Sequence, residues 1–422
     1  MNQTIFVLKM MQKYFIDEKL TSGMFDINAF VNASKIESFN LNKLHFFLKS
    51  SKIANKLQGF SRQALKKEKK DLISHSDPAA DLISIHESPM RFFEDFVAAL
   101  SNPDKDGRVL VTKNIDVPRK IQYILLNPSD LFSPIVSQAR SVILAGGTMD
   151  PMSDFINDLL PSFKKSIHTY SCGHVIGNDQ LLPICLPLGP QGITFKLSYE
   201  ERNKPDLILE MGRALANLTA VIPGGIVLFF ASYSYMNLVF KNWKASGIIE
   251  GLSKRKQIFV EPTLAAQTES CLRNYVQAIN NQSDRMTGAI LLAVVGGKMS
   301  EGINFSDSMA RAVIMIGVPF ANIKSQELKE KMAYMDSKHQ TDGGTSGAEY
   351  YENICMKSVN QCIGRAIRHR NDYACIILMD ERYQQPRIRG KLPKWIVDCG
   401  ICDIKIYGDC ISRISKFFKN KV

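Results

Sequence analysis

The sequence predicts an α/β protein in which a parallel sheet with flanking helices follows a mostly helical N-terminal region. From Gly107 onward, short apolar runs alternate with helical patterns. Several of these runs are apolar without alternation, as strands are when both faces of a sheet are buried. Repeated alternation of strand and helix is typical of right-handed βαβ units.

The N-terminal region, residues 1–105, is expected to be mostly helical. Apolar residues recur at helical spacing in Phe6–Phe15 and Leu41–Leu48. The charge run Lys66–Lys70 is interpreted as a solvated helix face rather than a DNA contact or a nuclear signal. The stretch NPDKDG at 102–107 is a strong turn signal, and the pattern changes after it.

The region after this turn is expected to contain strands separated by helices. The expected strands are Val109–Val111, Tyr123–Leu126, Val142–Ala145, Leu182–Leu186, Ile226–Phe230, Ile258–Val260, Ile290–Val295, Val313–Gly317 and Cys375–Met379. The expected helices are Pro205–Leu218, Tyr233–Ala245, Ser325–Tyr334 and Glu349–Arg368.

The charge balance favours a polyanionic partner. The 422 residues carry a formal net charge of +12, with a pI near 9.1. Lys and Arg that neutralise phosphates release condensed counterions, which favours binding. The nine cysteines are odd in number and scattered, which suits a reducing compartment. Cys399, Cys402 and Cys410 lack an evident fourth ligand, so no metal site is expected there.

No membrane partner is expected. No apolar run in the sequence is long enough to cross a bilayer. The N-terminus mixes Lys and Asp into its apolar residues and offers no small-residue cleavage site, so it is not a convincing signal peptide.

A glycine-rich segment, GGKMSEGINFSD at 296–307, directly follows an expected strand. Glycines at the carboxyl end of a strand let the backbone approach a ligand and present N–H groups to phosphates. The alternative is an ordinary tight turn between a strand and a helix, because a glycine motif alone is a weak signal.

A second segment, QCIGRAIRHR at 361–370, ends an expected helix. Arg365 and Arg368 are three residues apart and are expected on one helix face, with Gln361 about one turn before them. Guanidinium groups held rigidly in this way suit the oxygens of a phosphate in phosphoryl transfer. The alternative, a basic surface helix, is weakened by small Gly364 and Ala366, which allow close packing.

These segments resemble the motifs of a helicase family. QCIGRAIR at 361–368 resembles motif VI of superfamily 2, and GGKMSEGINFSD at 296–307 resembles motif V. Motif V is similar to that of the iron–sulfur DEAH-type (XPD-like) helicases, and most closely to their chromosome-loss branch. AGGTMDP at 145–151 resembles motif III, and PGGIVLFFASY at 223–233 resembles motif IV. The motifs occur in the expected order between about Gly107 and Arg387.

The resemblance implies an α/β, RecA-like fold and a role for each matched residue. In this family two RecA-like domains clamp ATP between them and move along single-stranded DNA. Arg368 would be the arginine finger, and Arg365 and Gln361 would contact phosphates beside it. Motif V residues would lie at the ATP and domain interface; these are Gly297, Glu301, Gly302 and Asp307.

Other matched residues would serve DNA binding and coupling. Gly147 and Thr148 of motif III would couple the ATP state to DNA movement. Ser232 and Tyr233 are DNA-backbone candidates, although Tyr233 is equally well explained as the first buried residue of the following helix. Asn304 stands where many XPD-like relatives have Asp, so a charged role does not carry over to it.

The phosphate-binding loop of the family is missing from the sequence. The loop requires G-x-x-x-x-G-K-[ST]. Lys298 follows Gly297, but Met299 replaces Ser or Thr and Leu292 occupies the first glycine position. DERY at 380–383 resembles a DExH box only superficially, because it follows motif VI, and is interpreted as a strand end.

The resemblance therefore implies the C-terminal half of a helicase. Residues 1–105 would be a helical arch-domain remnant, 106–152 the closing segment of the first motor domain, and 153–422 the second RecA-like motor domain. ATP and Mg²⁺ would be shared with the missing N-terminal motor half, and the 4Fe–4S cluster site of the family is expected to be absent.

The leading hypothesis is the C-terminal half of an ATP-dependent 5′–3′ DNA helicase, inactive alone. Its expected partners are single-stranded or forked DNA and cohesion or replication factors, and its expected location is the nucleus. The alternative is a non-catalytic module that binds single-stranded DNA or a cohesion partner. An unrelated α/β enzyme using 296–302 as its own phosphate loop would leave motifs III, IV and VI unexplained.

Overall fold

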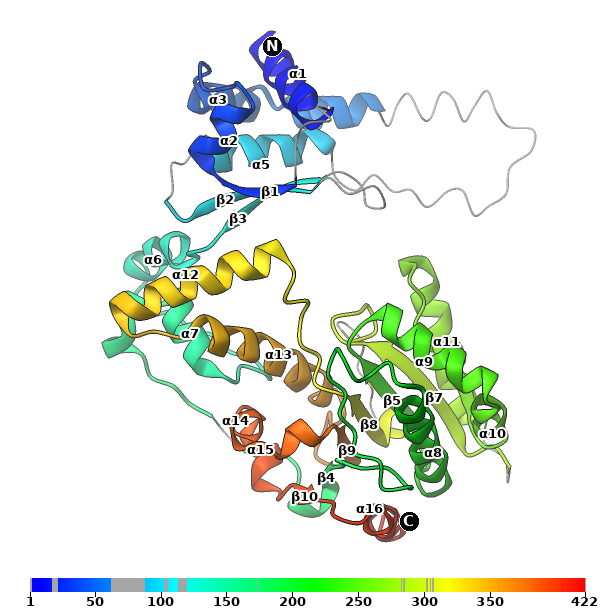
Figure 1. Ribbon diagram of the computed structural model, residues 1–422. Helices are drawn as coiled ribbons and strands as arrows, with labels where there is room; N and C mark the ends of the chain where they lie inside the picture. Colours follow the sequence, from blue (N-terminus) through cyan, green and yellow to red (C-terminus); the bar gives the residue numbers. More distant parts are fainter. Residues whose placement is uncertain are drawn as a thin grey trace, which may run out of the picture. The chain divides into compact units, whose positions relative to one another are not determined.

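The computed structural model describes residues 2–16, 22–61, 88–101, 105–112, 120–171, 173–281, 283, 285–300, 303, 305 and 307–421 (Figure 1). The charge run Lys66–Lys70 and the site candidates Glu301 and Gly302 lie outside these residues. The chain forms two compact units, one of Met1–Leu131 with Lys324–Tyr334 and one of Phe132–Ile323 with Met335–Val422. None of the helices in the described part of the chain is long and apolar enough to cross a membrane.

The first unit packs helices against a small antiparallel sheet. Its strands are β1 (Gly23–Asp26), β2 (Gly107–Thr112) and β3 (Lys120–Leu125), in the order β1-β2-β3. Its labelled helices are α1 (Asn2–Ile16), α2 (Ile27–Ala33), α3 (Leu41–Ser51) and α5 (Pro89–Ser101). Val7, Phe30, Leu48, Val97 and Val109 are fully buried in a shared core. The predicted helix-rich N-terminal region is confirmed, although β1 was not predicted.

The second unit is built on a seven-stranded parallel sheet. Its strand order is β10-β4-β9-β8-β5-β7-β6, and all neighbouring strands run parallel. The strands are β4 (Leu181–Cys185), β5 (Gly224–Phe230), β6 (Gln257–Val260), β7 (Gly288–Val294), β8 (Ala312–Ile316), β9 (Ala374–Met379) and β10 (Cys402–Asp403). The order doubles back repeatedly, as expected for strands joined by crossover helices.

Helices pack on both faces of this sheet, and alternate strand residues therefore enter two different cores. Ile226, Leu228 and Phe230 of β5 belong to a core with residues of α8, α9 and α16. Val227 and Phe229 belong to a core with residues of α11 and α13. The predicted α/β class, a RecA-like parallel sheet with flanking helices, is confirmed.

The remaining helices complete the chain. The α-helices are α6 (Ser129–Gln138), α7 (Met152–Leu159), α8 (Pro205–Val221), α9 (Tyr233–Ala245), α10 (Ile248–Ser253), α11 (Ala265–Asn280), α12 (Gln326–Asp342), α13 (Gly347–Ile363), α14 (Pro386–Arg389), α15 (Lys394–Asp398) and α16 (Tyr407–Lys419). The 3₁₀ helices are η2 (Pro161–Ser166), η3 (Asn178–Gln180), η4 (Asp307–Ala310) and η5 (Glu381–Gln384). The expected helix 233–245 has the predicted ends, and the one expected at 325–334 continues to Asp342.

One expected strand, Val142–Ala145, is wrong. The segment has no regular secondary structure, and Val142, Ile143 and Leu144 are 38%, 86% and 43% exposed. Its apolar residues suit a strand, but a strand needs neighbours to pair its backbone N–H and C=O groups. No strand pairs with it among the described residues. The composition of this segment indicates a high strand propensity, but it does not show whether another strand is present to pair with it.

The helical placement of Arg365 and Arg368 is also wrong. Helix α13 ends at Ile363, and Gly364 is its C-cap. The backbone N–H groups of Arg365 and Ala366 donate three residues back, to Cys362 and Ile363. The N–H of Arg368 donates instead to the Asp372 carboxylate at 3.2 Å. The helix ends for two reasons. Gly364 is a poor helix former, and the Asp372 carboxylate accepts the Arg368 N–H in place of a helical carbonyl.

A buried lysine lies where three strands of the second unit begin. Lys256 is fully buried before β6, and its Nζ donates to the carbonyl oxygens of Gly224 at 2.7 Å and Thr287 at 3.2 Å. No carboxylate forms an ion pair with it in the described parts of the chain. Burial lowers the pKa of its ammonium group to about 7.

We expect Lys256→Met to change how stability depends on pH. Between pH 7 and about 10, the unfolded chain keeps a proton on Lys256 that the folded chain has released. The free energy of unfolding of wild type should therefore rise with pH, relative to Lys256→Met, by up to about 1.4 kcal/mol per pH unit. Denaturant unfolding of both proteins at pH 7, 8 and 9 measures this. A constant difference across that range would contradict it.

Candidate functional site

The described site residues of motifs IV to VI lie at the two opposite ends of the strands of the parallel sheet, which we call its carboxyl edge and its amino edge. β5 ends at Phe230 and β7 ends at Val294, so Ser232, Tyr233 and Gly297 follow the carboxyl ends of these strands. The residues of η4 precede β8, and 365–372 precede β9, so both segments lie at the amino ends. Residues 295–300 thus lie at the carboxyl edge, and residues 307–311 lie at the amino edge. Of the motif V candidates, the structure places Gly297 and Asp307 at different edges.

The carboxyl edge holds the two DNA-backbone candidates. Ser232 is the N-cap of α9, and its Oγ accepts from the N–H of Tyr235 at 3.2 Å. Tyr233 begins the same helix, half-buried, and its hydroxyl donates to Oε1 of Glu261 at 2.8 Å. Burial, and this hydrogen bond, raise the pKa of Tyr233 to about 12. Tyr233 is therefore a neutral donor at physiological pH.

The turn after β7 is organised by Glu261, which is only 2% exposed. Its Oε2 accepts from the N–H of Val294 at 2.8 Å, and its Oε1 accepts from the N–H of Met299 at 3.0 Å. The carboxylate also explains why residue 297 is a glycine, because a Cβ at this position would lie 2.6 Å from Oε1 of Glu261. The Gly297 N–H donates to the Val294 carbonyl at 2.9 Å. These contacts favour a tight turn, since the N–H groups of Gly297 and Met299 already donate within it and are not free for a phosphate.

The amino edge holds the two predicted arginines. The guanidinium of Arg365 donates to the carbonyl of Ile303 at 3.3 Å, which ties motif VI to motif V. Arg368 is exposed, and burial of part of its guanidinium together with the charge of Arg365 lowers its pKa. Gln361 lies in the last turn of α13. The structure therefore brings these motif VI residues to one place.

Asp372, fully buried, connects the ends of motifs V and VI. Its Oδ1 accepts from the guanidinium of Arg311 and from its neighbour's N–H, both at 2.9 Å. Its Oδ2 accepts from the N–H groups of Arg368 at 3.2 Å and Asp307 at 3.5 Å. Asp307 also pairs with His369 at 2.9 Å. Asp307, His369 and Asp372 come within metal-ligand distance of one another, but the carboxylate of Asp372 is already paired with Arg311.

Motif III lies beside the end of α13. A Cβ on Gly364 would meet the side-chain methyl of Thr148 at 3.4 Å. The carbonyl oxygen of Asp150 accepts from the side chain of Asn360 at 3.3 Å. Gly147 is exposed, with open space where a Cβ would be. Thr148 is therefore close enough to motif VI for the two motifs to influence each other.

Sequence reasoning missed Glu261, Arg311 and Asp372. Glu261 is a single acidic residue after an expected strand, and its three donors come from residues 28, 33 and 38 positions away. Arg311 lies directly before β8 and Asp372 lies two residues before β9, so the two are 61 residues apart. An acidic residue beside a buried strand is a usable signal, because such a carboxylate needs hydrogen-bond donors. The DERY segment was interpreted as a strand end, and β9 does end just before it.

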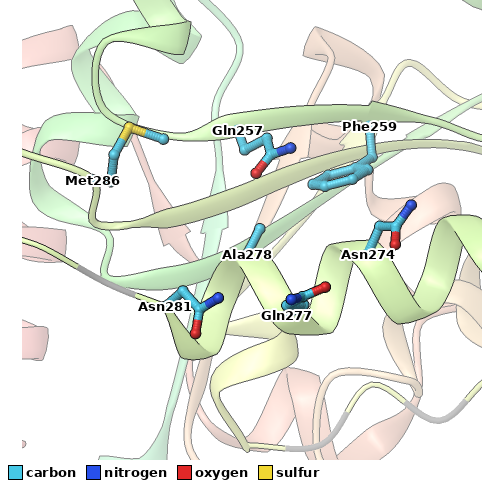
Figure 2. A pocket seen from close by; sticks show the side chains of 7 residues that line it. All are labelled: Gln257, Phe259, Asn274, Gln277, Ala278, Asn281 and Met286. Carbon is cyan, nitrogen blue, oxygen red and sulfur yellow. The ribbon is translucent and has the colours of Figure 1, made fainter.

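A pocket of about 390 Å³ lies between β6 and α11 (Figure 2). All of its lining residues are uncharged, and carboxamides predominate: Gln257, Phe259, Asn274, Gln277, Ala278, Asn281 and Met286. Because it contains no cation, it offers phosphate no charge partner, and it includes none of the predicted site residues. It is not part of the candidate site.

Comparison with known proteins gives a match to one domain family and to several helicases. Residues 215–399 match the family described as the helicase C-terminal domain. The chain is 40% identical over 412 residues to ATP-dependent DNA helicase DDX11 of Danio rerio, covering 89% of this chain and 46% of that protein. It is 40% identical over 388 residues to ATP-dependent DNA helicase CHL1 of Debaryomyces hansenii, covering 90% and 44%.

Solved structures of XPD proteins are also similar. A structure titled XPD_Helicase superimposes with a TM-score of 0.48 at 17% identity, covering 75% of this chain and 50% of that one. Xpd4 of S. tokodaii gives a TM-score of 0.46 at 14% identity, covering 93% and 74%.

The matched domain and the parallel sheet define the class: the chain carries a helicase C-terminal domain. The sequence relatives narrow this further. The chain is related to the DDX11 and CHL1 helicases, so the resemblance to the chromosome-loss branch of the XPD-like helicases is confirmed. The chain spans about half the length of the curated relatives it matches.

Proposed function

We propose that this chain supplies the second motor domain of an ATP-dependent DNA helicase. The observation that carries the proposal is that the described parts of motif V lie at both edges of the sheet, residues 296–300 after β7 and residue 307 before β8. At the amino edge Ile303 accepts from Arg365, and at the carboxyl edge the turn after β7 shares the Glu261 carboxylate with Tyr233. One segment that contacts both edges can transmit a change at a bound nucleotide to bound DNA.

The amino edge supplies the arginines of an ATP site. A guanidinium cannot lose its proton in a protein, so Arg365 and Arg368 present fixed positive charge to phosphate oxygens. Gln361 would contact phosphates beside them. Asp307, with Glu301 and Gly302, would lie at the domain interface. Mg²⁺ would be held by the motor half that carries the phosphate loop, because the sequence of this chain contains no such loop.

The carboxyl edge supplies the DNA contacts. Ser232 and Tyr233, the DNA-backbone candidates, lie at the end of β5. Gly297, which the resemblance assigns to the ATP and domain interface, lies at the same edge in the turn after β7. Thr148 and Gly147, near the end of α13, would couple the ATP state to DNA movement. The net charge of +12 supports a polyanionic partner.

The finer features of the proposal come from the resemblance. They are 5′–3′ unwinding of single-stranded or forked DNA, a nuclear location, and cohesion or replication partners. The proposed division is an arch-domain remnant at 1–105, a closing segment of the first motor domain at 106–152 and the second motor domain at 153–422. The family's 4Fe–4S cluster would belong to the other motor half.

We expect the 422-residue chain to bind single-stranded DNA with a steep dependence on salt. Roughly five phosphate contacts would lower the affinity about 100-fold between about 50 and 200 mM salt. Fluorescence anisotropy with a labelled oligonucleotide measures this. Absent or salt-independent binding would count against the proposal. Binding without any nucleotide hydrolysis, even beside a first motor half, would favour a non-catalytic module that holds DNA or a cohesion partner.

A further inference from the structure

Glu261 is a buried carboxylate without a cationic partner among the residues that the structure describes. A buried charge is costly unless hydrogen bonds satisfy it. Here three donors do so, the hydroxyl of Tyr233 at 2.8 Å and the N–H groups of Val294 and Met299 at 2.8 and 3.0 Å. The Glu261 carboxylate therefore fixes the positions of all three donors.

The three donors come from two different strand ends. Tyr233 begins α9, directly after the end of β5, whereas Val294 ends β7 and Met299 lies in the following turn. Glu261 itself follows β6, which pairs with β7 and is the outermost strand of the sheet. One side chain thus fixes a tyrosine on one side and the backbone of a turn on the other.

We infer that Glu261 is a positioning residue for the DNA-facing edge of the sheet, acting through Tyr233 and the turn Val294–Met299; this rests on the proposed function. The carboxylate does not contact DNA, because it is buried. It orients the tyrosine side chain and holds the turn closed, so that the two strand ends face DNA as one surface.

A carboxamide cannot reproduce this arrangement. Both oxygens of Glu261 accept from a backbone N–H, whereas Glu261→Gln keeps one oxygen and turns an NH₂ group toward the N–H of Val294 or of Met299, neither of which can accept. Shape is kept, and at least one of the three contacts is lost. Tyr233→Phe removes only the hydroxyl. Glu269→Gln is a matched control, because Glu269 is 81% exposed on α11 and pairs with Arg273 at the helix surface.

Affinity for a labelled single-stranded oligonucleotide should fall about tenfold in Glu261→Gln and in Tyr233→Phe. In the double variant the loss should be smaller than the product of the two single losses, because both changes weaken the same hydrogen-bonded group around Glu261. Glu269→Gln should bind as wild type does. Additive losses, or wild-type affinity in Glu261→Gln, would overturn the inference. If Glu261 only stabilised the fold, the losses of DNA affinity in the two single variants would add in the double variant. In that case the effect of Glu261→Gln would not depend on whether the Tyr233 hydroxyl is present.

Hydrogen exchange separates this inference from the proposed function. At least one of the two amides, of Val294 or of Met299, should exchange more than about tenfold faster in Glu261→Gln than in Glu269→Gln, because the carboxamide leaves one of them without an acceptor. If wild type does not bind DNA, the proposed function fails, and the exchange rates alone decide whether Glu261 holds this turn. Equal exchange rates in the two variants would overturn the positioning role.

Discussion

Arg368→Ala is expected to lower ATP turnover about 1,000-fold or more when this chain is combined with a first motor half that carries the phosphate loop. The exposed Arg368 lies beside Arg365 at the amino edge, and both can face a nucleotide held by a second domain. An arginine finger stabilises charge that develops on the transferred phosphoryl group, so its loss affects the chemical step more than nucleotide binding. Steady-state hydrolysis at saturating ATP and DNA measures the effect.

Arg370→Ala is the matched control for this prediction. Arg370 is also exposed and lies two residues further along, but it is not part of the QxxGRxxR pattern. We expect its loss to change turnover by less than about threefold. Turnover of Arg368→Ala within a few-fold of wild type would remove the finger assignment. An equal loss in Arg370→Ala would indicate a general effect of positive charge at this edge.

Asp372→Ala is expected to have the largest effect on stability. The change leaves Arg311, whose side chain is only 11% exposed, without its carboxylate partner. It also removes the acceptor of the Arg368 and Asp307 N–H groups. Breaking a buried ion pair by removing one partner costs about 3–5 kcal/mol. Denaturant unfolding measures this loss, and one below about 1 kcal/mol would contradict the account of Asp372 as the residue that joins motifs V and VI.

An exposed ion pair provides the comparison for Asp372. Arg273 and Glu269 are 71% and 81% exposed and lie 3.5 Å apart on one helix. Because solvent screens such pairs, Glu269→Ala should change the free energy of unfolding by less than about 1 kcal/mol. The contrast between the two variants isolates the effect of burial.

The central sheet was predictable because its strands are buried on both faces. The strands expected between Leu182 and Met379 are all present, with shifts of one or two residues at their ends. The failures involve partners that lie far away in the sequence. Val142–Ala145 has the composition of a strand and no neighbouring strand among the described residues. Helix α13 ends early because a carboxylate nine residues beyond Ile363 captures the Arg368 N–H.

The candidate site was predictable only in part, for a related reason. The arginines and glycines belong to ordered motifs, so their spacing together with the resemblance to helicase motifs indicated them. Glu261 and Asp372 belong to no motif in the sequence, and their importance comes largely from distant donors, 28 to 38 residues away for Glu261 and 61 and 65 residues away for Asp372. The sequence also grouped Gly297 with Asp307, whereas the fold places them at opposite edges of the sheet. The roles of these residues at ATP and DNA stay predictions.

The most direct test of the central claim is DNA-stimulated ATP hydrolysis by this chain alone and after mixing with a separately expressed first motor half of a relative. The account predicts no hydrolysis by the chain alone. The mixture should hydrolyse ATP, and Arg368→Ala should abolish that activity, because each half supplies only part of the ATP site. Hydrolysis by the chain alone would contradict the account, as would a mixture that stays inactive while both halves are folded and bind DNA.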